Sequence, residues 1–237
     1  MFACPPEPRP CSTHADRFNF TQPLHNLKAS LAKPGKIEIV AIGSSSTAGE
    51  GGVVPYPERL ATLLREHFHD RMIDVLNRGV GGQEATSQLP RLQREVVAER
   101  PALVIWQVGT NAVFRNDEFD FGDVINAIVK GVRTLKGSSD VVIMDSQFVP
   151  AVVDGEKLKL SEELVGRIAR VAEVDSVNVF RRFDLMRHWV DHDHVPIDEL
   201  VREGDEKMLH MSDWATDCVT RALFQSITAR LEADSAA

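Results

Sequence analysis

The sequence predicts an α/β protein in which a central parallel sheet of about five strands lies between two layers of helices. Two observations predict this three-layer α/β/α sandwich. Short runs rich in β-branched residues alternate along the chain with longer segments whose apolar residues recur every three or four positions. At 237 residues, of which 43% are hydrophobic, the chain is also long enough for one domain with a large core.

Each predicted element rests on its local pattern. Continuous apolar runs are typical of parallel strands buried on both faces, and five of them occur, at residues 37–42, 72–77, 103–108, 141–144 and 177–180. Between these runs, apolar residues at helical spacing predict helices that pack one face on the sheet. In chain order these are a helix from Pro57 to His69, helices marked by Leu89 to Val96, Val124 to Leu135 and Leu164 to Val171, a patch around Met186 and Trp189, and a last helix opened by Ser212.

The first 35 residues differ in composition from the rest, because they hold six of the 12 prolines and two of the three cysteines. We expect residues 1–35 to form an extended arm laid over a single domain of residues 36–237. A disulfide between Cys4 and Cys11 is one interpretation of this arm, and a pair of free thiols is the other. Cys218 is expected in the core. A disulfide would favour a periplasmic or secreted protein, and the sequence leaves the compartment open.

The formal net charge of -8 argues against nucleic acid or an anionic membrane as the main partner, because either would repel the chain. No apolar run approaches the roughly 20 residues of a transmembrane helix, so we expect no membrane-spanning segment. A small molecule is the expected partner, and the sequence leaves the oligomeric state open.

The turn after the first predicted strand is rich in small hydroxyl residues, with the sequence Gly43-Ser44-Ser45-Ser46-Thr47. Its spacing fits neither a phosphate-binding P-loop nor a dinucleotide fingerprint nor a G-x-S-x-G nucleophile elbow. Open α/β sheets place their chemistry at the carboxyl ends of strands, so Ser45 is a candidate nucleophile. The alternative is that these serines only cap a helix.

Two further turns are expected at the same edge of the sheet. The second strand ends in a glycine-rich turn, residues 78–82, and the third ends in Gly109-Thr110-Asn111. Because the strands are parallel, all three turns can converge on one pocket. A nucleophilic serine needs a base, and His210, just before the final helix, is the candidate.

These segments resemble the four sequence blocks of the SGNH hydrolases, also called GDSL lipases or esterases. The resemblance implies a flavodoxin-like SGNH hydrolase fold and a serine hydrolase that needs no cofactor. It implies that Ser45 is the nucleophile and His210 the general base, with an oxyanion hole formed by the amides of Ser45 and Gly82 and the side chain of Asn111. The blocks are Gly43 to Thr47, Asn77 to Gly82, Gly109 to Asn111 and Leu209 to Asp213, in the family's order.

The sequence departs from the family pattern at two positions. Ser44 stands where the family often has an aspartate that is not the catalytic one, so we expect little effect. Lys207 stands three residues before His210, where the family has the aspartate that orients the histidine. Either a loop of different length brings Asp205 to His210, or the site is a Ser-His dyad whose imidazole is held by a backbone carbonyl.

A cluster of histidines and aspartates follows the patch around Trp189. Two of its histidines share a helical face, as metal ligands can, but we interpret the cluster as a solvated, acidic helix end and expect no metal. Recovery of activity with zinc after chelation would contradict this expectation. Arg181 and Arg182 are interpreted as a surface pair near an acidic loop. The cluster comprises His188, Asp191, His192, Asp193 and His194.

Together these features predict a serine esterase that works through an acyl-enzyme. By family analogy, its substrates are short-chain esters, above all acetyl esters, of an alcohol or a carbohydrate. Two alternatives stay open. A lysophospholipase or thioesterase would need a longer apolar channel, and activity that grows with chain length would identify it. A catalytically weak carbohydrate-binding relative, which Lys207 makes credible, would bind its ligand without reacting at Ser45.

Overall fold

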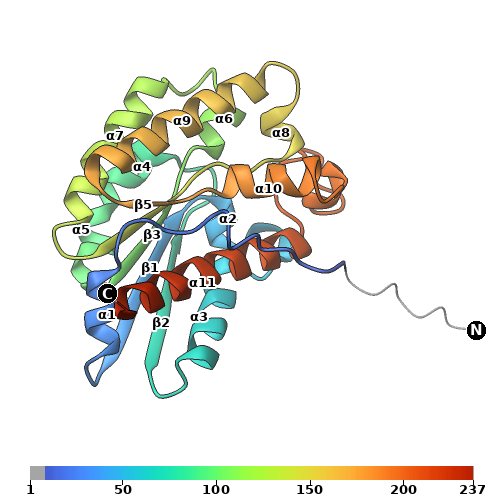
Figure 1. The fold of residues 1–237 in the computed structure, drawn as a ribbon. Coiled ribbons are helices and arrows are strands. Elements are labelled where there is room, and N and C mark those ends of the chain that lie inside the picture. The colour runs from blue at the N-terminus through green and yellow to red at the C-terminus, as the bar shows by residue number, and fades with distance from the viewer. Residues whose placement is uncertain (1–8, 237) are drawn as a thin grey trace, which may run out of the picture.

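The computed structural model describes residues 9–236 and contains one sheet of five parallel strands in the order β2-β1-β3-β4-β5 (Figure 1). Helices cover both faces of the sheet, so the predicted fold class is confirmed. The strands are β1 (Lys36–Gly43), β2 (Met72–Gly79), β3 (Leu103–Gln107), β4 (Asp140–Met144) and β5 (Asn178–Phe180).

The central strands are apolar because helices bury both of their faces. All residues of β3 are buried, as are residues 39–43 of β1. The pairing of β1 with β2 runs from Lys36 and Met72 to Gly43 and Gly79, so these two strands end side by side. β2 lies outside β1, and the chain then crosses to β3 on the other side of β1. Such a reversal of strand order is the point at which open α/β sheets bind their ligands.

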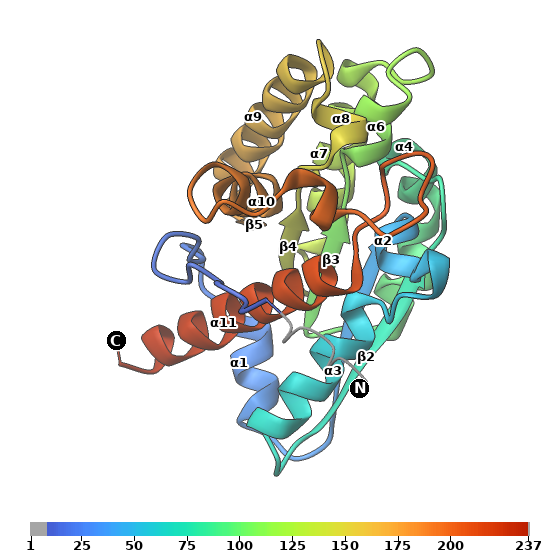
Figure 2. The same ribbon diagram turned by 90° about the vertical axis from the view of Figure 1, so that its right-hand side faces the viewer.

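Two pairs of helices form the outer layers. α3 (Tyr56–His67) and α11 (Asp213–Ala236) contact each other on one face of the sheet, and α7 (Phe121–Leu135) and α9 (Lys157–Asp175) contact each other on the other face (Figures 1 and 2). α10 (Arg182–Asp191) follows β5 directly. None of the helices within residues 9–236 is both long and apolar enough to cross a membrane.

α7 shows how the sequence sets the packing of a layer. Asp120 caps its start, since the carboxylate accepts a hydrogen bond from Asp123 N at 3.0 Å. Gly131 lies against the sheet, where a Cβ would come within 2.1 Å of the Trp106 ring on β3. The helix therefore approaches the sheet closely at this position. Its buried apolar residues, at the predicted spacing, are Val124, Ile128, Val132 and Leu135.

The predicted helix from Leu89 to Val96 is wrong as a single element. Pro90 lies inside the segment, has no N–H to donate and clashes with the preceding turn, so a continuous helix cannot form. Arg100 closes the segment with a φ of 52°. The segment consists instead of α4 (Ala85–Gln88), η2 (Leu89–Arg91), α5 (Leu92–Glu95) and η3 (Val97–Glu99), where η denotes a 3-10 turn.

Several further elements are too short to leave a periodic pattern, and the sequence did not predict them. Two of them begin at the predicted site turns: α2 (Ser45–Ala48) follows β1, and α6 (Thr110–Phe114) follows β3. α1 lies within the predicted arm, part of which is therefore helical. The others are α1 (His25–Leu31), α8 (Pro150–Val153), η1 (Glu50–Gly52) and η4 (Ile197–Leu200).

The arm is fastened to the domain by a disulfide between Cys11 and Cys218 of α11, whose Cα atoms are 5.5 Å apart. The interpretation that pairs Cys11 with Cys4 is therefore wrong, and Cys4 itself lies outside the described residues. Cys218 is buried as expected, but as half of this bridge. Trp189 Nε1 donates to Ser12 O at 2.7 Å. This contact holds the arm against α10 and directs Cys11 toward α11.

Replacing Cys11 with serine is expected to lower the free energy of unfolding by about 2–5 kcal/mol, because the bridge joins residues that are 207 positions apart and restricts the unfolded chain. For a chain of this length, the loss corresponds to a fall in Tm of roughly 5–15 °C. Calorimetry of both proteins, with and without dithiothreitol, measures the effect. The reductant should lower the Tm of the wild type alone, and identical melting of all four samples would contradict the bridge.

Candidate active site

Ser45 lies at the start of α2, in the turn that follows β1. Gln107, the last residue of β3, holds this turn, because its Oε1 accepts hydrogen bonds from Ser44 N and Ser44 Oγ, both at 2.8 Å. Gly49 ends α2 with a φ of 88°, a conformation that glycine adopts at no steric cost. Ser45 is thus placed in a rigid, largely buried turn with only 8% of its surface exposed.

The glycine-rich turn after β2 packs directly against α2. A Cβ on Gly79 would lie 2.3 Å from Ala48 N, so glycine is needed for this close approach. Gly82 has a φ of 74°. In the described part of the chain, neither the Ser45 amide nor the Gly82 amide donates a hydrogen bond to another residue. Unused backbone N–H groups at a sheet edge are the donors that an oxyanion hole requires.

Asn111 lies on α6 and reaches the same glycine-rich turn, because its Nδ2 donates to Gln83 O at 3.0 Å. The buried carboxylate of Glu84 holds the two turns together. Its Oε1 accepts from Gly109 N at 2.8 Å, and its Oε2 accepts from Ala112 N at 3.0 Å. Burial raises the pKa of Glu84, and these backbone donors oppose the rise.

Sequence reasoning missed two residues that position the site, Glu84 and Gln107. Both are 1% exposed, and both accept hydrogen bonds from the turns that carry Asn111 and Ser45. A signal was present for Gln107, since a polar side chain inside an otherwise apolar strand must find a partner when it is buried. Glu84 offered a weaker signal, as a charged residue in a turn expected at the site.

His210 lies at the end of a hairpin-like loop. A hydrogen bond from Arg202 N to His210 O, at 2.8 Å, and a β-bridge between Val201 and Met211 close the base of this loop. Within the loop, Asp205 Oδ2 lies 3.1 Å from His210 Nδ1 and accepts a hydrogen bond from His210 N at 2.7 Å. The loop thus brings a carboxylate to the imidazole from five positions earlier in the chain.

The surroundings of Asp205 keep its carboxylate ionised. Its side chain is 6% exposed, and this burial would raise its pKa. Hydrogen bonds from the N–H groups of His210 and Leu209 and from the imidazole outweigh burial and lower the pKa of Asp205 to about 2. A charged carboxylate at this position can hold the imidazole in one orientation and tautomer. Lys207 is exposed to solvent.

Ser45 and His210 line the same small cavity, whose volume is about 20 Å³. Glu50 also faces it, with Oε2 at 3.8 Å from His210 Nε2. A Cβ on Gly81 would lie 1.5 Å from Glu50 Oε1, so this carboxylate also lies against the glycine-rich turn. Within residues 9–236, no hydrogen bond joins Ser45 to His210. The other lining residues are Ser46, Gly49, Val53, Pro55, Met211 and Thr216.

The other two predicted oxyanion residues form a second group beside this cavity. Gly82 and Asn111 do not line the cavity itself. Asn111 bonds to Gln83, directly after Gly82, whereas Gly81, directly before it, contacts Glu50. The glycine-rich turn therefore connects the two groups.

A buried arginine supports the turn that carries Asn111. Arg182 is fully buried, so its interpretation as a surface residue is wrong. Its Nε and Nη2 donate to Asp145 O at 3.1 and 2.9 Å, and Nη2 also lies 3.3 Å from Thr110 Oγ1. Burial lowers the pKa of Arg182 to about 10 and raises that of Asp145 to about 7.

The raised pKa of Asp145 is expected to make stability depend on pH. A carboxyl group that holds its proton more tightly when folded favours the fold at low pH, so stability should fall as the pH rises from 3.8 to about 7. Asp145→Asn removes this ionisation and should flatten the profile. The stability of the variant relative to the wild type should therefore rise between pH 3.8 and about 7, on the order of a few kcal/mol in total. Urea unfolding at several pH values measures it. Parallel profiles for variant and wild type would contradict the assignment.

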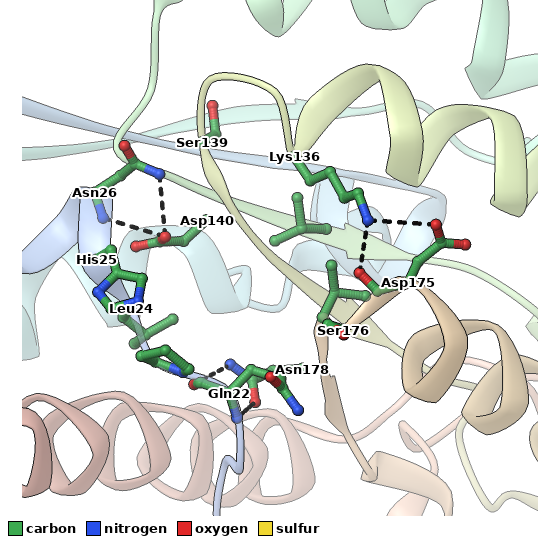
Figure 3. A pocket seen from close by; sticks show the side chains of 13 residues that line it. Gln22, Leu24, His25, Asn26, Lys136, Ser139, Asp140, Asp175, Ser176 and Asn178 are labelled. Atoms are coloured by element: carbon green, nitrogen blue, oxygen red, sulfur yellow. Dashed lines mark hydrogen bonds and ion pairs between the residues drawn. The ribbon is translucent and has the colours of Figure 1, made fainter.

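A larger hollow, of about 370 Å³, lies at the opposite edge of the sheet, where β4 and β5 begin (Figure 3). None of the predicted site residues lines it. Its polar side chains bond to their neighbours: Lys136 Nζ lies 3.4 Å from Asp175 Oδ1, and Asn178 Nδ2 donates to Gln22 O at 2.8 Å. Of the predicted site residues, Ser45 and His210 line the smaller cavity instead.

Comparisons with known proteins identify a matching family model and several solved structures of similar fold. The model of the Non-GDSL lipase-like family matches residues 10–233. Among curated proteins, none matches the sequence. Of the solved structures, the chain is similar to a catalytic mutant of Axe2, an acetylxylan esterase from Geobacillus stearothermophilus, with 16% identity and a TM-score of 0.69 over 82% of this chain and 96% of that chain. It is also similar to LAE5, an α/β hydrolase enzyme from the metagenome of Lake Arreo, Spain, with 17% identity and a TM-score of 0.68 over 81% and 95% of the two chains.

Proposed function

We propose that this chain, which belongs to the Non-GDSL lipase-like family of SGNH-like hydrolases, is a serine esterase acting on short-chain esters of an alcohol or a carbohydrate. One observation carries the proposal. Ser45 and His210 line a common cavity, and Asp205 Oδ2 lies 3.1 Å from His210 Nδ1. Solved structures of Axe2 include catalytic mutants in which a serine, a histidine or an aspartate is replaced by alanine. The three residues proposed here are of the same types.

Each of the three side chains takes a role that its surroundings support. Ser45 Oγ attacks the carbonyl carbon of the ester, and its proton passes to His210 Nε2. His210 then gives this proton to the departing alkoxide, which leaves as the alcohol, and Ser45 keeps the acyl group. Water, deprotonated by the same imidazole, attacks the acyl-enzyme and releases the acid and the free serine. Asp205 holds the imidazole throughout.

The oxyanion hole of this proposal consists of the amides of Ser45 and Gly82 and the Asn111 side chain. The two amides donate to no described residue, and Asn111 Nδ2 has a second hydrogen besides the one it gives to Gln83. Preorganised donors of this kind are worth about 2.7–4 kcal/mol each in transition-state stabilisation. Glu84 supports them, because it fixes the turn of Asn111 relative to that of Gly82.

The size of the cavity supports a short acyl group. The free space beside Ser45, of about 20 Å³, holds about one water molecule and does not form a long channel. A lysophospholipase or thioesterase would need a long apolar channel at the same serine, so this alternative has less support. The Glu50 carboxylate, half exposed beside His210, lies between glycines that let its turn move when substrate enters. It also offers an acceptor for the hydroxyl groups of a carbohydrate.

Intact-mass measurement after treatment with a fluorophosphonate probe tests the proposal. We expect a single adduct, mapped to Ser45, together with hydrolysis of aryl acetates that slows as the acyl chain lengthens. A folded wild-type protein that takes up no probe would reject the serine esterase and leave the carbohydrate-binding alternative. Rates that rise with chain length would instead support a lipase or thioesterase.

A further inference from the structure

We propose that His14, His188 and Asp193 bind one divalent transition-metal ion of the Zn²⁺ type, and that this ion clamps the arm to the end of α10. One ligand atom from each of the three side chains lies within 4.8 Å of the other two. None of the three residues lines the cavity that holds Ser45, so this site is separate from the candidate active site. The cluster at residues 188–194 that the sequence shows does not include His14, because His14 comes from the distant arm.

The arm presents His14 from a fixed position. Cys11 is bonded to Cys218, and Ser12 O accepts a hydrogen bond from Trp189 Nε1 at 2.7 Å. These contacts anchor the chain just before His14 to both α11 and α10. His14 itself has a φ of 44°, a conformation that residues other than glycine keep only where their surroundings hold them.

The chain after α10 turns back toward the helix and so brings Asp193 to His188. Asp193 N donates to His188 O at 3.3 Å, and Val195 N donates to Trp189 O at 2.9 Å. His194, between these two donors, also has a positive φ, of 56°. Two of the five described residues other than glycine with positive φ therefore lie in or beside this cluster.

The three ligand atoms lie close to the positions that a bound metal ion requires. His14 Nε2 lies 2.7 Å from Asp193 Oδ2, and the rings of His14 and His188 have their centroids 4.4 Å apart at an angle of 80°. Ligand atoms about 2.0–2.2 Å from a tetrahedral zinc ion are about 3.4 Å from one another, so small side-chain rotations complete the site. The His14 and Asp193 side chains are 18% and 29% exposed, which leaves a fourth position open to water.

A hydrogen bond between His14 and Asp193, without metal, is the competing explanation. It accounts for the 2.7 Å contact, but it gives no role to the His188 ring, whose centroid lies 4.4 Å from that of His14 and which also packs against Phe18 and His192. Two imidazoles and one carboxylate are also a ligand set found in three-ligand zinc sites. The two explanations differ in what they predict when zinc is added.

Calorimetric titration of the chelator-treated protein with Zn²⁺ distinguishes them. We expect one ion per chain and a Tm that rises by several degrees in excess Zn²⁺, because the ion binds only the folded cluster. His14→Ala and Asp193→Asn should each weaken binding at least about tenfold, because each removes one of three ligands. Tetrahedral Co²⁺ used in place of Zn²⁺ should show a visible absorption that His188→Ala abolishes.

His69→Ala is the matched control, because its side chain is 82% exposed and lies outside the cluster. This variant should bind Zn²⁺ as the wild type does, and circular dichroism verifies that all variants fold. None of the readouts uses ester hydrolysis, so the result does not depend on whether the proposed esterase function is correct. Wild-type protein that binds Zn²⁺ no more tightly than His14→Ala, or equal weakening by His69→Ala, would overturn the site.

Discussion

Replacing Ser45 with alanine is expected to lower kcat for aryl acetate hydrolysis by at least about a thousandfold. The reason is chemical, because the variant has no oxygen at this position to form the acyl-enzyme. The fold should be unaffected, since Ser45 Oγ makes no hydrogen bond within residues 9–236 and a smaller side chain fits the same turn. Steady-state kinetics and the melting curve of the same samples measure both expectations.

Ser46→Ala is the control for this experiment. Ser46 is the next residue, lines the same cavity, and donates from Oγ to Gln147 Oε1 at 3.1 Å. The proposed reaction gives Ser46 no covalent role, so kcat should stay within about fivefold of the wild type. Equal activity of the wild type and Ser45→Ala would refute the nucleophile, and a collapse only in Ser46→Ala would transfer the role to the neighbouring hydroxyl.

Replacing Asp205 with asparagine is expected to lower kcat by about a hundredfold to ten-thousandfold. The amide keeps the size of the side chain, but it removes the charge that stabilises the imidazolium formed when His210 takes the proton from Ser45. KM should change little, because Asp205 does not line the cavity that holds Ser45. A large fall in kcat at nearly constant KM is the signature of a positioning residue, whereas general loosening of the loop would alter both.

Glu206→Gln is the matched control for Asp205→Asn, because it removes the same charge from an exposed neighbour. It should leave kcat within about threefold of the wild type. If kcat of Asp205→Asn falls by less than about threefold, Asp205 is not part of a triad, and the Ser-His dyad is the better description of the site. Lys207 stands three residues before His210, at the position that the family pattern assigns to the aspartate. Lys207→Asp therefore tests whether an aspartate three residues before His210 can replace Asp205.

The strands were predictable because the pattern of a doubly covered parallel strand is local. The run at 37–42 became Lys36–Gly43, and that at 103–108 became Leu103–Gln107. The predicted helix from Pro57 to His69 became Tyr56–His67, a difference no larger than the usual uncertainty of helix ends. The order of the turns along the chain then placed Ser45 and Asn111 at one edge of the sheet, because parallel strands all end on the same side.

The features that escaped prediction depend on contacts between distant residues. The sequence offered Asp205 as one of two ways to hold His210 but could not decide between them, because the approach depends on the pairing of Val201 with Met211, which no local pattern indicates. The burial of Arg182 depends on a carbonyl at the end of another strand. The bridge from Cys11 to Cys218 joins the two ends of the chain, and cysteine spacing alone cannot reveal such a pairing.

The hairpin-like loop closed by Val201 and Met211 carries both the base and its carboxylate partner. Opening this loop would break the hydrogen bonds from Arg202 N to His210 O and from Ala151 N to Met208 O and the contact of Gln147 Nε2 with Leu209 O, but none within the sheet, so it should need less free energy than global unfolding. Because both groups would leave the serine together, warming should switch off turnover in a single step while the helical signal persists. Cooling should restore the rate without any refolding of the sheet.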